Sequence, residues 1–178
     1  PPPALPNVQI TCSRADLVEA LTTAVTVSPA KSARKILEDV LLRATPGPRG
    51  RLEIYATDLE VSARLVVAQA DVTGSEPLEV LVNAKRFLAL ARAITDDRVA
   101  ITPRDLGVIR ISSAGGSREK FDVVTSPDPG EFPDLDFLDV APKSGLHALI
   151  DGDALATAID RTAFACADKA TRYSLDGV

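Results

Sequence analysis

The sequence contains no methionine and no tryptophan, and it has only two cysteines and one histidine. Cys12 falls in an apparent strand and Cys166 in an apparent helix, and neither stands near a second cysteine or a histidine at the spacing of metal ligands. We expect both to be small buried residues. His147 has no nearby nucleophile or acid that would complete a catalytic triad, which favours a structural or surface role.

Catalytic motifs are also missing, because the sequence has no phosphate-binding glycine loop, nucleophile elbow or zinc pattern. Two carboxylates stand close together in Thr57-Asp58-Leu59-Glu60, and a metal-dependent hydrolase that uses Asp58 and Glu60 is one hypothesis. No third ligand follows nearby, so a turn in which Asp58 bonds local backbone amides is the favoured interpretation. We expect no enzymatic activity and no cofactor.

Long apolar runs are absent as well, since none approaches the roughly 18 residues that cross a membrane. Pro1 to Asn7 lack the basic start and apolar stretch of a signal peptide. With 46% apolar and 25% charged residues, we expect a folded, soluble protein of the cytoplasm. The net charge of -5 argues against binding nucleic acid by bulk attraction, so DNA binding must be local or topological.

A unit of strand, helix cap and helix recurs three times, at intervals of about 70 residues. Its predicted N-caps are Ser13, Asn83 and Asp151, each after an alternating strand and before a helix with one apolar face. The apolar faces of the three helices are Leu17, Leu21 and Ala24, then Phe87, Ala91 and Ile94, then Leu155, Ile159 and Thr162. One unit is too small to bury a core, so two units should form a domain.

Short strands punctuated by turn residues separate the helices, about four strands to each unit. The predicted strands after the first helix are Ile36 to Ala44, Arg51 to Ala56, Val61 to Ala70 and Leu78 to Val82, and those after the second are Val99 to Thr102, Val108 to Ser112 and Lys120 to Thr125. This pattern predicts an α+β fold in which two helices pack on antiparallel sheets in each domain.

The domain organisation follows from the repeat. We expect an extended or disordered tail over 1–6, a complete first domain over 7–125, a linker over 126–145 and the start of a second domain over 146–178. Apolar residues of the linker should dock on a domain, namely Phe132, Leu135, Phe137 and Leu138. Because the chain lacks an initiating methionine and stops in a strand-like run, we expect it to be a piece of a longer protein.

Basic residues gather on the second predicted helix, where Lys85 and Arg92 share the face opposite the apolar one and Arg86 flanks it. The loop after the first helix adds Lys31, Arg34 and Lys35. Two interpretations stay open, a solvated helix surface and a face that meets DNA phosphates without reading bases.

Five strings in this order resemble the bacterial sliding clamp, the beta subunit of DNA polymerase III, from Val8 to Val178. They are Ile36 to Leu42, Ala56 to Glu60, Val82 to Phe87, Glu131 to Leu135 and Thr171 to Val178. The resemblance implies the DNA-clamp fold and a non-catalytic processivity factor. It also implies three similar domains per subunit, a head-to-tail homodimeric ring around double-stranded DNA, and the polymerase III alpha subunit and the clamp loader as partners. A free-standing clamp-like interaction module is the alternative.

The resemblance also implies roles for single residues. Those implied to contact DNA are Lys31, Lys85, Arg86, Arg92, Arg172 and Tyr173. Leu175 matches a wall of the pocket that receives clamp-binding peptides, and Phe121 and Val123 match the edge strand that pairs across the ring interface. Lys35 departs from the proline that the family usually has at its position.

Overall fold

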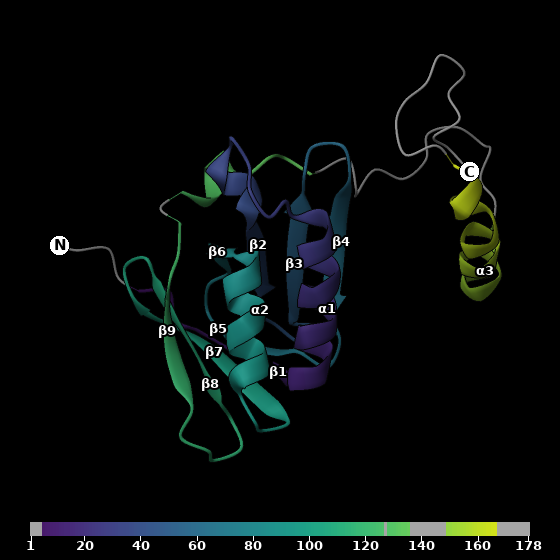
Figure 1. The fold of residues 1–178 in the computed structure, drawn as a ribbon. Helices are drawn as coiled ribbons and strands as arrows, with labels where there is room; N and C mark the ends of the chain where they lie inside the picture. The colour runs from purple at the N-terminus through teal and green to yellow at the C-terminus, as the bar shows by residue number, and fades with distance from the viewer. Residues whose placement is uncertain (1–4, 127, 136–148, 167–178) are drawn as a thin grey trace. The chain divides into compact units, whose positions relative to one another are not determined.

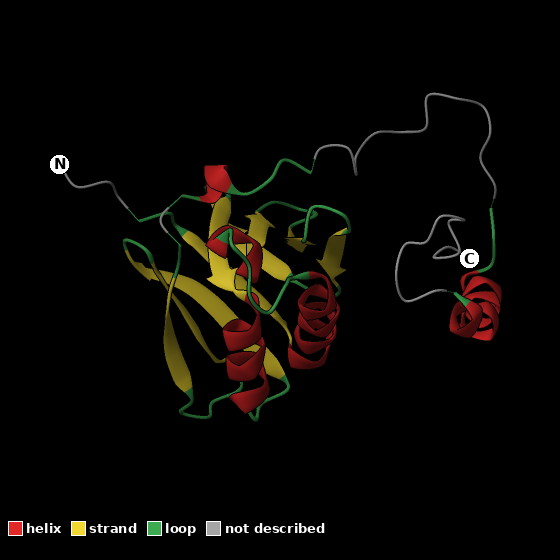
Figure 2. Cartoon of the chain, turned by 45° about the horizontal axis from the view of Figure 1, so that its top comes forward, coloured by secondary structure: helices red, strands yellow, loops and turns green. Residues whose placement is uncertain are grey.

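The computed structural model describes residues 5–126, 128–135 and 149–166 (Figure 1). The chain divides into two units, Pro1–Leu138 and Asp139–Val178, of which the first holds two antiparallel sheets and two helices. Both helices lie on the sheets in Figures 1 and 2, and the main core lies between these layers. This confirms the predicted α+β clamp architecture for the first unit.

A five-stranded sheet has the order β5-β1-β7-β8-β9. Its strands are β1 (Val8–Ser13), β5 (Asp71–Gly74), β7 (Arg98–Asp105), β8 (Val108–Ser113) and β9 (Lys120–Val124). Gly107 closes the β7–β8 hairpin with φ 72°, a conformation that glycine adopts at little cost. Among the described residues, β9 pairs with β8 alone and is therefore an edge strand.

A four-stranded sheet has the order β4-β3-β2-β6. Its strands are β2 (Asp39–Thr45), β3 (Arg51–Thr57), β4 (Ser62–Val67) and β6 (Leu78–Asn83). The register places Leu42 between Ile54 and Val80, so apolar residues of three strands line up on the face toward the helices. β2 belongs to the first sequence repeat and pairs with β6, the strand that opens the second repeat.

Two predicted strands have different limits in the structure. Residues 36–38 belong to the 3-10 helix η1 (Lys35–Glu38) rather than to a strand, because the Glu38 carboxylate bonds back to Ser32 and Lys35 and folds the chain. The predicted strand Val61 to Ala70 ends early, since Gln69 takes a positive φ of 51° and turns the chain into β5. The first repeat therefore has five strands instead of four.

All three predicted helices exist and begin at their predicted caps. They are α1 (Arg14–Val27), α2 (Ala84–Ala93) and α3 (Gly152–Thr162). The cap side chain accepts the backbone N–H three residues on at 3.4 Å for Ser13, 3.1 Å for Asn83 and 3.0 Å for Asp151. These bonds satisfy amides that have no partner within the helix.

Burial separates the first two helices from the third. The predicted apolar faces of α1 and α2 are buried, with Leu21 and Phe87 both 0% exposed. On α3, Leu155 and Ile159 remain 44% and 42% exposed, because no strand in the described part of the second unit covers them. Cys12 is buried as predicted, but Cys166, just beyond the 3-10 helix η4 (Ala163–Ala165), is only half-buried, which corrects that prediction.

The start of the predicted linker docks on the first unit. Ser126 forms a β-bridge with Leu81, and the 3-10 helix η2 (Pro129–Glu131) follows. Phe132 and Leu135 are buried on the face of the four-stranded sheet that points away from the helices. They pack there with Leu41, Tyr55 and Leu81. The docking prediction is confirmed for these two residues, whereas Phe137 and Leu138 lie outside the described residues.

Candidate nucleic-acid interface

The surface of α2 carries a basic face, defined by Lys85, Arg86 and Arg92, which are all exposed. The opposite side of the helix is fixed to the core through its buried apolar residues, Phe87 and Ala91 among them. No acidic residue occurs in this helix. The α2 basic face is therefore a positive surface whose backbone is held in place by the core behind it.

The neighbouring helix α1 presents a different surface. Its exposed Thr22, Thr23 and Thr26 donate their hydroxyl hydrogens to carbonyls of their own helix at 2.6, 3.3 and 2.7 Å. Thr22 Oγ1 in turn accepts a hydrogen bond from Arg92 Nη2 at 3.2 Å. Within α1 the single basic residue, Arg14, is outweighed by Asp16 and Glu19, so the net positive charge of the helix layer comes from α2.

The loop that carries Lys31 is tied to the beginning of α2. Glu38 Oε1 accepts hydrogen bonds from Ser32 N and Lys35 Nζ, both at 3.0 Å. The Ser32 amide, followed by Lys35, holds the pKa of Glu38 below its usual range. Asn83 caps α2 and also donates from Nδ2 to Glu38 O at 3.3 Å. Lys31 is exposed, so its charge adds to those at this end of the basic face.

The edge strand β9 places the predicted interface residues against the core. Val123 is 4% exposed and Phe121 is half-buried, whereas Val124 is 75% exposed. Asp122 lies on the outer face, where Arg110 binds it through two hydrogen bonds of 2.7 and 2.9 Å and lowers its pKa. A partner strand could therefore reach the backbone edge of β9 and Val124 more readily than the side chain of Val123.

The two carboxylates considered as a catalytic pair belong to a turn. Asp58 Oδ1 accepts the backbone N–H groups of Glu60 and Val61 at 2.9 and 2.7 Å, which holds the pKa of Asp58 low, Val61 contributing most. Leu59 takes a positive φ of 81° at the tip. Among the described residues, no group of histidine, cysteine and acidic side chains could hold a metal ion. The predicted turn is confirmed, and nothing in its geometry favours a hydrolase.

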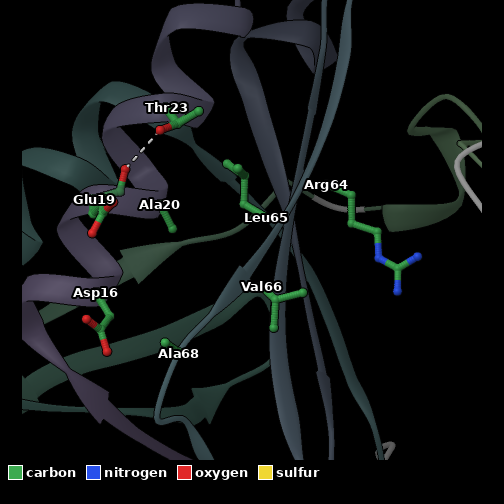
Figure 3. A pocket seen from close by; sticks show the side chains of 8 residues that line it. All are labelled: Asp16, Glu19, Ala20, Thr23, Arg64, Leu65, Val66 and Ala68. Carbon is green, nitrogen blue, oxygen red and sulfur yellow. Dashed lines mark hydrogen bonds between the residues drawn. The ribbon is translucent and has the colours of Figure 1, made fainter. Parts of the chain in front are cut away.

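A groove of about 320 Å³ lies between α1 and β4 (Figure 3). Asp16 and Glu19 line its helix side, and Leu65 lies between the helix and the strand. Arg64 points away from the helix and bonds Glu53 at 2.9 Å. The Thr23 hydroxyl also lines the groove, but it donates to Glu19 O of its own helix at 3.3 Å. The groove borders β4, an edge strand of the four-stranded sheet. It offers a surface for contact and no catalytic constellation.

Sequence comparison then gives the family. The family model described as DNA polymerase III beta subunit, N-terminal domain, matches residues 8–136. The chain belongs to this family. Beta subunits of DNA polymerase III are non-catalytic, and this agrees with the absence of catalytic motifs from the sequence. The match spans both sheets and both helices of the first unit.

Relatives of the beta-subunit family are longer than this chain. The beta sliding clamp of Chlamydia muridarum is 27% identical over 167 residues, which cover 93% of this chain and 42% of that protein. The sliding clamp structure from Bacillus subtilis superposes with a TM-score of 0.74 at 20% identity and covers 94% of this chain and 42% of its own. The clamp from Pseudomonas aeruginosa bound to griselimycin gives 0.71 at 26% identity, with 96% and 43% covered. The chain thus spans less than half the length of these relatives.

Three residues singled out from the beta-subunit resemblance, Arg172, Tyr173 and Leu175, lie outside the described residues. The structure brings Lys31 and the α2 basic face to the helix side of the first unit and places Phe121 and Val123 on the edge strand. Sequence reasoning missed the bonds that connect the Lys31 loop to α2. The Asn83 cap was the available signal, but its second hydrogen bond needs a partner 45 residues away.

No helix in the described ranges has the length and hydrophobicity to cross a membrane.

Proposed function

We propose that the chain is the opening part of a sliding clamp, a processivity factor that encircles double-stranded DNA. Family membership supports this, as does a positive helix surface on a chain whose net charge is -5. A ring retains DNA by enclosing it, so its lining needs only weak attraction and can slide. The proposed domain limits remain 7–125 for the first domain, 126–145 for the linker and 146–178 for the start of the second.

The observation that carries the proposal is the exposed, acid-free basic face of α2, joined to the Lys31 loop. Flexible lysine and arginine side chains on a rigid helix can contact phosphates without reading bases. Lys85, Arg86, Arg92 and Lys31 are the proposed contacts in the described residues, and Arg172 and Tyr173 would add contacts from the second domain. Binding should therefore show no sequence preference and should weaken with salt.

Two different free edges support a head-to-tail ring. β9 is one edge of the five-stranded sheet, and β4, beside the groove on α1, is one edge of the four-stranded sheet. A contact between unlike surfaces can repeat from unit to unit and close into a ring. We propose that β9, backed by Phe121 and Val123, pairs with an edge strand of the neighbouring subunit in a homodimer.

The proposed protein partners are the DNA polymerase III alpha subunit and the clamp loader. Their clamp-binding peptides would enter a pocket to which Leu175 contributes one wall. Because these partners act on the bacterial chromosome, the proposed compartment is the cytoplasm. A short peptide that binds in an apolar pocket allows partners to exchange, since each one buries little surface.

Retention on DNA tests encirclement directly. The clamp that contains this chain should stay on nicked circular DNA after loading and slide off once the circle is linearised. Equal retention on both forms would speak against encirclement. For the 178-residue chain alone, we expect weak affinity for a short duplex that falls steeply with added salt. A chain that binds no DNA at low salt but captures clamp-binding peptides would favour the interaction module.

A further inference from the structure

The connection between α2 and β7 is hydrogen-bonded to the turn between β8 and β9, and both lie at the same end of the first unit (Figure 1). The Ser113 hydroxyl donates a hydrogen bond to the Asp96 carboxylate, and Ser117 N donates to Asp96 Oδ2 at 3.1 Å. Thr95 Oγ1 donates to Glu119 Oε1 at 2.7 Å. Two consecutive residues after α2 thus hold both ends of the hairpin, and we call Thr95 and Asp96 with these bonds the hairpin clasp.

The backbone packs closely at the hairpin clasp. Ser113 N donates to Glu119 O at 3.0 Å and closes the hairpin, while Ala114 N donates to Arg98 O at 3.0 Å. A Cβ atom placed on Gly115 would lie 3.1 Å from Asp96 Cγ, closer than an ordinary van der Waals contact. The turn therefore sits directly on the Asp96 carboxylate.

Charge strengthens the clasp, because both acceptors are carboxylates. The bonds from Ser117 hold the pKa of Asp96 below its usual range, and the Thr95 hydroxyl does the same for Glu119. Both groups are therefore ionised at neutral pH. Hydrogen bonds to an ionised acceptor are stronger than those between neutral groups, so the clasp resists local opening.

An edge strand with one neighbour needs support of this kind. β9 pairs only with β8, and strands at sheet edges open locally more easily than central ones. Phe121 and Val123 hold the middle of β9 to the core, and Asp122 is bonded to Arg110. The clasp is the link from the start of β9 to the end of α2.

We propose that Thr95 and Asp96 are positioning residues that fix the edge strand β9 relative to α2. This inference rests on the proposed function, in which β9 pairs with the neighbouring subunit and α2 faces DNA. The clasp would then set the orientation of the DNA-facing helix relative to the ring interface.

Amide hydrogen exchange of the 178-residue chain tests the clasp without DNA. Asp96→Ala should accelerate exchange of the amides of β9 about tenfold, because it removes two hydrogen bonds to a charged acceptor. The amides of β2 and β3 should be unchanged. Asp97→Ala is the matched control, since it removes an exposed carboxylate one residue away. Unchanged exchange in β9, or an equal acceleration in β2 and β3, would overturn the proposal.

A second pair of variants covers the case in which Asp96→Ala fails to fold. Thr95→Val keeps the shape of the side chain but cannot donate to Glu119, whereas Thr95→Ser keeps the hydroxyl. We expect faster exchange of the β9 amides in Thr95→Val and near-normal exchange in Thr95→Ser. Equal exchange in the two variants would mean that the hydroxyl does not position the strand.

Position itself can be measured with spin labels at Ala89 on α2 and Val124 on β9. Cys166 would be replaced by serine, while Cys12 can stay, because burial raises its pKa to about 12 and keeps the thiol unreactive. The distance distribution should broaden in Asp96→Ala but not in Asp97→Ala. A distance distribution that stays narrow in Asp96→Ala would overturn the positioning role of the clasp, whatever the DNA-binding measurements show. If the distribution broadens but charge reversal on α2 leaves DNA affinity unchanged, the positioning role is supported and the proposed function is wrong.

Discussion

The helices α1 and α2 occupy equivalent places in the two repeats, yet their outer surfaces differ. Both begin at a side-chain cap after a strand, and both bury an apolar face completely. Outward, α2 shows Lys85, Arg86 and Arg92, whereas α1 shows threonines and Glu19. The repeat therefore preserves what the fold needs, and the basic surface that we propose contacts DNA occurs on one of the two helices.

The same comparison explains why the net charge of the chain gave little indication of the DNA contact that we propose. A net charge of -5 hides three positive charges placed together on one helix face. Attraction to phosphates depends on the charges within about a Debye length, roughly 8–10 Å at physiological salt. The acidic residues elsewhere in the chain thus weaken the basic face less than the net charge suggests.

The largest expected effects should strike both helices alike, because their buried faces do the same work. Leu21→Ala and Phe87→Ala should each lower the free energy of unfolding by about 2–5 kcal/mol, since both leave a cavity in a fully buried site. Urea unfolding followed by circular dichroism measures this. Ala89→Ser, at an exposed site of α2, should stay within about 0.5 kcal/mol. A tolerated substitution at either buried site would break the equivalence.

Charge reversal should distinguish the basic face of α2 from basic residues elsewhere on the surface. Lys85→Glu combined with Arg92→Glu should weaken binding to a short duplex and reduce the salt slope of the binding constant by about 2, since two phosphate contacts are lost. Fluorescence anisotropy over a salt series gives both values. Arg49→Glu with Arg104→Glu changes the net charge equally at exposed sites outside α2 and should have a smaller effect. Equal losses in both double variants would leave α2 without a special role.

The caps should again behave alike, with one difference. Ser13→Ala should lower the free energy of unfolding by about 1 kcal/mol, the usual value for losing an N-cap. Asn83→Ala should cost more, because Asn83 also bonds Glu38 O and joins the Lys31 loop to α2. Thermal unfolding of the two variants side by side measures the difference. Equal losses would indicate that this second bond contributes nothing.

The smallest effect concerns pH and the tie between the loop after α1 and the start of α2. The pKa of Glu38 is lower in the folded chain than in the unfolded one, so its stabilisation is present above the ordinary glutamate pKa and disappears as pH falls through the folded value. The wild type should exceed Glu38→Gln slightly in stability at pH 7 and match it in acid. Urea unfolding midpoints of the two proteins across a pH series measure the difference in stability. A difference that persists in acid would show that packing, and not the charge of Glu38, causes it.

Much of the fold was predictable because the signals were local. The alternation of apolar residues, the caps and the turn residues gave the helices and most strands, and Asp58 satisfied its turn with amides two and three residues away. Other features had no local signal. The 3-10 helix before β2 depends on the bonds of Glu38, and β5 is a four-residue strand whose partners in β1 lie at least 60 positions away.

The sequence by itself determined where the helices begin and which of their faces are apolar. It also showed that known catalytic motifs are absent and which family the chain resembles. Each of these depends on residues close together along the chain. Only the tertiary structure decided that the Lys31 loop is hydrogen-bonded to the start of α2. It also decided that the side chain of Val123 faces the core while one backbone edge of β9 is left unpaired among the described residues. The bond from Asp96 to the β8–β9 turn was likewise visible only in the folded chain. Such contacts join residues that pairing and packing bring together, and their sequence separation leaves no periodic pattern to read.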